Sequence, residues 1–156
     1  MKRITESKKV FGITKNEDLA TLKKIYRDLI KAWHPDKFQD EVKKEEAELK
    51  STEIIEAYHF LVSIAPETHE ANVEEYNNTI NNFFIEDFEF KGQTLRVTFQ
   101  DKSTYEYFGV PKTVYTKFIN ADSRPRFGRR QIFNSYTFGK INIITQYDII
   151  NAISEA

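Results

Sequence analysis

The stretch DLATLKKIYRDLIKAWHPDK, from Asp18 to Lys37, decides the fold of the first part of the chain. Its apolar residues recur at spacings of three and four, which predicts a helix with one buried face. These residues are Leu22, Ile25, Tyr26, Leu29, Ile30 and Trp33. Asn16 or Asp18 can cap the start of the helix by accepting a backbone N–H bond. Pro35 ends it at about His34, because the residue before a proline avoids the helical conformation.

A second amphipathic run follows from Val42 to Ala65 and stops at Pro66. Its inward residues are Ala47, Ile54, Ala57, Tyr58, Leu61 and Ala65. Two helices joined by a loop of only a few residues run antiparallel and bury their apolar faces on each other. We therefore expect a helical hairpin with the triplet His34-Pro35-Asp36 exposed at its tip. The residues expected to close the open side of this small core are Val10, Phe11 and Ile13.

The periodicity changes to alternation in the second half of the chain. Apolar and polar residues alternate over three segments, which are separated by turn residues at 91–92 and 101–103. This pattern predicts an antiparallel three-stranded β-meander. Its apolar residues are Phe88, Phe90, Leu95, Val97, Phe99, Tyr105 and Tyr107.

Further elements are expected after the meander. Residues 112–121 predict a helix, and 123–131 a basic loop. Residues 132–138 and 141–144 are candidate strands. Residues 145–154 predict a closing helix, in which Thr145 and Asp148 have the spacing of a capping box.

The overall expectation is an α+β protein in three parts. Residues 1–65 form an all-α helical hairpin, 66–85 a connecting helix, and 86–156 a small α+β domain. Val73, Tyr76, Ile80, Phe83 and Phe84 give the connecting helix its apolar spacing. Residues 66–87 contain six acidic residues and no basic residue, so this segment separates two mildly basic parts.

Composition narrows the function classes. The chain has 156 residues, of which 40% are hydrophobic and 30% charged, as in ordinary globular proteins. It has no cysteine, which excludes disulfides, thiolate nucleophiles and zinc–thiolate sites. We find no signal peptide and no apolar run of the roughly 18 residues that a membrane span needs. We therefore expect a soluble, cytoplasmic protein that does not bind membranes.

The first 65 residues resemble the J domain, the module of DnaJ-type co-chaperones. The resemblance is carried by FGIT at 11–14, KKIYRDLIKAWHPDK at 23–37 and EIIEAYHFL at 53–61. It implies docking on a DnaK-type heat-shock chaperone and acceleration of that partner's ATP hydrolysis. It assigns the triggering role to His34, Pro35 and Asp36. It assigns the docking face to Lys23, Lys24, Tyr26, Arg27 and Lys31, with Lys37 beside the triplet.

The basic residues of the first helix fit such a docking role, but they also have purely structural explanations. Lys24, Arg27 and Lys31 are three and four residues apart, so they can form a basic stripe that steers an acidic partner. The stripe could equally be a solvated helix face, and the triplet alone could be a helix terminator. The chain has three histidines, His34, His59 and His69, and none has the spacing of a metal site or a Ser-His pair. We expect no enzyme activity, no metal and no cofactor.

Some residues depart from the J-domain pattern. Asp28 occupies a helix position that is often basic in that family. Ser51 stands where the family usually buries a phenylalanine, which would thin the hairpin core. We expect some apolar residues off the main face to pack on Phe11, on the connecting helix or on the second domain. These residues are Ile55, Phe60, Val62 and Ile64.

Residues 86–136 look like the KTSC domain, a small module found alone or appended to some lysyl-tRNA synthetases. The resemblance is carried by LRVTFQDKSTYEYFGVP at 95–111 and VYTKFINADS at 114–123. RNA binding is proposed for that family, and basic residues interleaved with aromatic ones suit it. The candidate RNA-binding residues are Arg124, Arg126, Phe127, Arg129, Arg130, Tyr105 and Tyr107. Alternatively, the arginines form a solvated loop that pairs with Glu70, Glu74 and Glu75.

Two functions follow from these observations. The first is a co-chaperone that stimulates a DnaK-type ATPase, with the second domain supplying location or a client protein. The alternative is an RNA- or ribosome-associated binding protein in which the hairpin is mainly structural.

Overall fold

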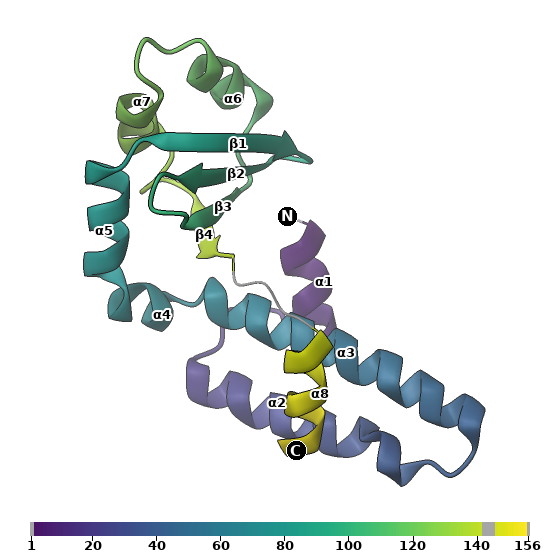
Figure 1. The fold of residues 1–156 in the computed structure, drawn as a ribbon. Coiled ribbons are helices and arrows are strands. Elements are labelled where there is room, and N and C mark those ends of the chain that lie inside the picture. Colours follow the sequence, from purple (N-terminus) through teal and green to yellow (C-terminus); the bar gives the residue numbers. More distant parts are fainter. Residues whose placement is uncertain (1, 142–145, 156) are drawn as a thin grey trace. The chain divides into compact units, whose positions relative to one another are not determined.

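A computed structural model describes residues 2–141 and 146–155. The chain divides into two compact units, one of Lys2–Glu67 with Asn142–Ala156 and the other of Thr68–Ile141. The first unit is helical, and the second combines helices with a four-stranded antiparallel sheet, which confirms the predicted α+β class (Figure 1). No described helix is both long and apolar enough to cross a membrane.

The first unit contains the predicted hairpin. Its elements are α1 (Lys2–Phe11), α2 (Leu19–Trp33), a 3-10 turn η1 (Pro35–Lys37), α3 (Glu41–Ser63) and α8 (Gln146–Glu155). Helices α2 and α3 lie antiparallel, and α1 packs on α3 (Figure 1). Asp18 is the cap of α2, since its carboxylate accepts a 2.7 Å bond from the Thr21 N–H. Helix α1 was missed, because only its last residues had been expected to contact the hairpin.

The core of the first unit is mostly aliphatic. Its buried residues are Phe11, Leu22, Ile30, Ile54, Ile55, Ala57, Leu61 and Ile149. Ile55 lies in this cluster with Phe11, and Val62 and Ile64 pack against it, as expected for residues off the main hairpin face. Phe60 is buried as well, with the Arg3 guanidinium 4.3 Å from the centre of its ring.

The second unit is built around the predicted meander. Its elements are α4 (Pro66–Ala71), α5 (Val73–Asn82), β1 (Ile85–Lys91), β2 (Thr94–Phe99), β3 (Thr104–Phe108), α6 (Lys112–Ile119), α7 (Arg124–Gln131) and β4 (Thr137–Lys140). The strand order is β1-β2-β3-β4, and all neighbouring strands are antiparallel. Gly92 and Gln93 join β1 to β2 with φ of 56° and 63°, as a tight two-residue hairpin turn requires.

Four expectations differ from this structure. The candidate strand at 132–138 is present only at its end, because β4 begins at Thr137 and runs on to Lys140. The single connecting helix is two helices, α4 and α5, and α5 packs in the core of the second unit. The basic loop at 123–131 is helix α7, capped by Ser123, which accepts the Arg126 N–H. The closing helix α8 belongs to the first unit, although we had placed it in the second domain. Most of the candidate strand at 141–144, and the Thr145 cap, lie outside the described residues.

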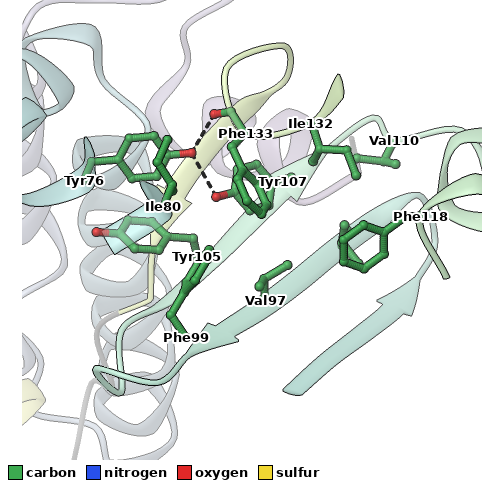
Figure 2. Packing of buried hydrophobic residues seen from close by; sticks show 11 residues of the cluster. Tyr76, Ile80, Val97, Phe99, Tyr105, Tyr107, Val110, Phe118, Ile132 and Phe133 are labelled. Carbon is green, nitrogen blue, oxygen red and sulfur yellow. Dashed lines mark hydrogen bonds between the residues drawn. The ribbon is translucent and has the colours of Figure 1, made fainter. Parts of the chain in front are cut away.

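The core of the second unit is aromatic (Figure 2). Strand residues of one sheet face meet side chains from α5, α6 and the segment after α7. The buried residues are Tyr76, Ile80, Leu95, Val97, Phe99, Tyr105, Tyr107, Val110, Phe118, Ile132 and Phe133. The Tyr76 hydroxyl lies 2.9 Å from the Tyr107 hydroxyl and donates to the Phe133 carbonyl at 2.5 Å (Figure 2). Burying these hydroxyls is tolerated because they are hydrogen-bonded.

Candidate partner-binding site

The His-Pro-Asp triplet forms the tip of the α2–α3 hairpin. His34 has φ −61° and ψ 129°, the extended conformation that a following proline favours, and this stops α2. Pro35 is buried and starts the 3-10 turn η1, which fixes the backbone of the tip. The Asp36 side chain is 83% exposed, whereas that of His34 is only 21% exposed. The tip therefore presents its carboxylate to solvent more openly than its imidazole.

Both nitrogens of the His34 ring have partners. Nδ1 accepts the Asp36 backbone N–H at 3.2 Å, so it carries no hydrogen. Nε2 then carries the ring hydrogen and donates it to the Ile153 carbonyl in α8, 3.0 Å away. The Asp36 carboxylate is 3.7 Å from Nδ1, which is beyond hydrogen-bond distance. The imidazole is thus held in one tautomer between its own loop and α8.

The end of α2 is fixed by a bond that the sequence did not predict. Ser51 in α3 is fully buried, and its hydroxyl donates a 2.9 Å hydrogen bond to the Trp33 carbonyl. The last carbonyls of a helix have no partner within the helix, so this bond satisfies one of them. The Trp33 ring also stacks on Phe38, at 6.4 Å between centroids. Ser51 therefore acts as a clamp behind the tip, because its hydrogen bond joins α3 to the last residue of α2.

The basic residues assigned to docking lie on one exposed surface. All are exposed on α2 or beside the triplet; they are Lys23, Lys24, Arg27, Lys31 and Lys37. The Lys24 ammonium lies 4.0 Å from Asp28, so the acidic departure at that position partly offsets one of these charges. Tyr26 is half-buried and stacks on Tyr58 at 4.2 Å. Tyr26 is thus as much a part of the hairpin packing as of the surface.

The four candidate RNA-binding arginines all lie on helix α7, but they fall into two pairs with different surroundings. Arg124 donates to the Ile119 carbonyl at 3.2 Å and lies 5.3 Å from the centre of the Phe88 ring. Arg129 donates to the Ile80 carbonyl at 3.2 Å. Arg126 and Arg130 are exposed and four residues apart, so they share a face of α7. These two are the arginines best placed to meet a phosphate.

The candidate aromatic residues lie in the core of the second unit. Tyr105 is 4% exposed, Tyr107 is fully buried, and Phe127 packs against Phe118. Burial raises the pKa of Tyr105 to about 12 and that of Tyr107 well above its usual range, so both hydroxyls stay neutral. The rings of Tyr105 and Tyr107 are covered by protein, which removes these two residues from any surface that stacks on bases, whereas Phe127 is only partly buried.

One residue of the acidic segment, Glu75, has a partner other than the arginines considered above. Glu75 accepts a 2.6 Å bond from the Lys140 ammonium in β4. Among residues 2–141 and 146–155, no group of three or more histidine or acidic side chains is placed to hold a metal ion.

Comparison with known proteins gives two matches that correspond to the two units. A family model of the DnaJ domain matches residues 9–69, and one of the KTSC domain matches residues 83–136. The chaperone protein DnaJ of Thermoplasma volcanium is 45% identical over 53 residues, which are 34% of this chain and 14% of that protein. DnaJ homolog subfamily B member 6-B of Xenopus laevis is 46% identical over 52 residues, 33% of this chain and 20% of that protein.

The chain spans only 14 to 20% of the length of these curated relatives, so the similarity describes a module and not a whole protein. The hairpin with its His-Pro-Asp tip lies within the first match, and the meander with its Tyr-Glu-Tyr triplet lies within the second. Helix α8 lies outside both. The protein therefore carries a DnaJ domain at residues 9–69 followed by a KTSC domain at residues 83–136.

Proposed function

We propose that this protein is a co-chaperone that docks on a DnaK-type chaperone and accelerates its ATP hydrolysis. The observation that carries the proposal is the triplet at the hairpin tip, next to the exposed basic residues of α2. The exposed cations steer the domain toward an acidic surface of the partner and set its orientation more than its affinity. The chain itself performs no catalytic step, because its role is to bias the conformation of the partner.

The test is single-turnover ATP hydrolysis by a DnaK-type chaperone from the same cell. The wild type should accelerate hydrolysis, and His34→Gln should abolish the acceleration. His59→Gln is the matched control, because His59 is an exposed histidine on α3 away from the tip. Circular dichroism confirms that each variant is folded. Equal acceleration by the wild type and His34→Gln would reject the triggering role of the triplet.

A second candidate function is binding of single-stranded RNA by the KTSC domain. It is favoured by the exposed pair Arg126 and Arg130 on α7. Cations that neutralise phosphates release counterions, so the affinity should fall with salt, with a slope of about 0.7 per contact. In this function the helical hairpin of the first unit is mainly structural.

The test of RNA binding is a salt titration of fluorescence anisotropy with an unstructured RNA oligonucleotide. Replacing both Arg126 and Arg130 by alanine should weaken binding and flatten the salt slope. Replacing Lys112 and Lys117 by alanine is the charge-matched control, since both lysines are exposed on α6. Equal losses in the two double variants would indicate non-specific attraction, and no binding by the wild type would remove this function.

A further inference from the structure

The triggering histidine of the tip is occupied by a part of the chain that is not part of the DnaJ match. Helix α8 packs on the first unit through Ile149, which is 6% exposed within the hairpin core, and through the partly buried Ala152 and Ile153. At the same place, the Ile153 carbonyl accepts the Nε2 hydrogen of His34. Helix α8 therefore combines an apolar anchor with a direct bond to the tip.

We propose that α8 is a built-in latch that restrains the J domain until the helix detaches. The inference rests on the proposed co-chaperone function, because it concerns how the same tip is regulated. While α8 is docked, both ring nitrogens of His34 are hydrogen-bonded, one to the Asp36 N–H and the other to the Ile153 carbonyl. Only 21% of the His34 side chain is exposed. The basic residues of α2 remain exposed. The latch therefore withholds the trigger and leaves the docking face open.

The contact is small enough to be reversible. Helix α8 has ten residues, and isolated helices of that length are marginal in water, so its order depends on docking. The anchor has one buried residue, Ile149, and the remaining buried core of the unit comes from α1, α2 and α3. Detachment therefore leaves the hairpin core in place. If the latch is open in about one tenth of molecules, the apparent affinity of the active state is lowered about tenfold.

The test compares adjacent isoleucines of α8. The variant Ile149→Asp places a charge in the buried contact, whereas Ile150→Asp places the same charge at a position that is 52% exposed. A double variant, Ile149→Asp with Ile153→Asp, removes both apolar contacts. Each is measured in single-turnover ATP hydrolysis by the DnaK-type chaperone. Nitrogen NMR of the His34 ring and amide hydrogen exchange of α8 report detachment without the partner.

The latch predicts that the Ile149 variants expose α8 amides to exchange, free His34 Nε2 and stimulate hydrolysis several-fold more than the wild type. Ile150→Asp should match the wild type, and adding His34→Gln should abolish every gain. If the detached variants stimulate no more than the wild type does, α8 is no latch, and the co-chaperone function stands. A loss of stimulation on detachment would make α8 a support for the trigger. If no variant stimulates at all, the proposed function fails, and the latch fails with it.

Discussion

Each of the two domains carries a three-residue motif that combines an aromatic ring with a carboxylate. One motif lies at the surface of the structure and the other in a core. In the J domain, Asp36 of the His-Pro-Asp triplet is 83% exposed on a turn that Pro35 keeps out of both helices. In the KTSC domain, the triplet Tyr105-Glu106-Tyr107 lies in the third strand of the sheet, with both tyrosines buried. A motif on a helix-ending turn is available to a partner, whereas a motif on a central strand is part of the core.

The physical origin of this difference is the backbone period. A strand turns successive side chains to opposite faces, so the two tyrosines share one face with Leu95 and Val97 of the neighbouring strand. A proline after a helix instead ends the regular repeat, so the side chains of the following turn have no shared buried face. If this explanation is correct, substitutions of the buried tyrosines should destabilise the second unit and leave the stability of the first unit unchanged.

The largest expected effect is on Tyr107. Tyr107→Ala should destabilise the second unit by about 3–5 kcal/mol, because it removes a fully buried ring. Tyr107→Phe keeps the ring and should cost about 1 kcal/mol for the lost hydroxyl bond to Tyr76. Amide hydrogen exchange of residues 85–108 measures the second unit, and fluorescence of Trp33, the single tryptophan, measures the first. Equal losses in both units would show that the two units unfold together.

The next effect concerns Gly128 in α7. Alanine is usually better than glycine in a helix by about 1 kcal/mol. Here an added Cβ would lie 2.6 Å from Cε2 and 2.8 Å from Cε1 of the Phe133 ring, so Gly128→Ala should destabilise the second unit by about 1–3 kcal/mol. Urea unfolding followed by hydrogen exchange checks the sign. A stabilising effect would mean that the Phe133 ring moves aside without loss.

A comparable effect is expected in the first unit at Ser51. Ser51→Ala leaves the Trp33 carbonyl without its 2.9 Å bond and should cost about 1–3 kcal/mol. Thr52→Ala is the control, because its hydroxyl bonds an exposed carbonyl of the same helix and should change stability by less than about 0.5 kcal/mol. Trp33 fluorescence during urea unfolding measures both variants. Indistinguishable stabilities would show that Ser51 is not the clamp behind the tip.

The smallest expected effect is a pH dependence from His69, which stacks on Phe138 at 4.0 Å. Burial lowers the pKa of His69 below 6.5, opposed by a hydrogen bond to the Phe138 backbone. The unfolded chain then binds more protons, so the stability of the second unit should fall as the pH drops below about 6.5. His69→Phe keeps the stacked ring and should remove this dependence between about pH 7.5 and 5.5. An unchanged profile would assign the dependence to another group.

The periodic elements were predictable from the sequence, and the contacts between distant segments were not. The spacing of Leu22, Ile30 and Trp33 gives α2, and Pro35 gives its end within one residue. The meander follows from alternation and the Gly92 turn. The arginine-rich segment became a helix instead of a loop, because the Ser123 cap and the packing of Phe127 on Phe118 outweigh its polar composition.

The candidate site was predicted at its tip and missed in its surroundings. His34, Pro35 and Asp36 are marked by the proline and by the flanking helices. Ser51 was expected only to thin the core, since no local pattern shows that its hydroxyl meets Trp33. Ile153 contributes a backbone carbonyl, which any residue supplies, and it lies 119 positions from His34. Only the folded chain brings the two together.

The return of α8 to the first unit gives the chain the topology of a guest domain inserted into a host. Residues 68–141 fold between two segments of the same helical body. Under the proposed latch, the folded guest is the tether that sets the effective concentration of α8 at its docking site. A ligand that changes the separation between the two ends of the guest changes that concentration, and with it the fraction of open latch. Under that proposal, a ligand bound to the KTSC domain would change the exposure of His34, a residue that lies outside the KTSC match.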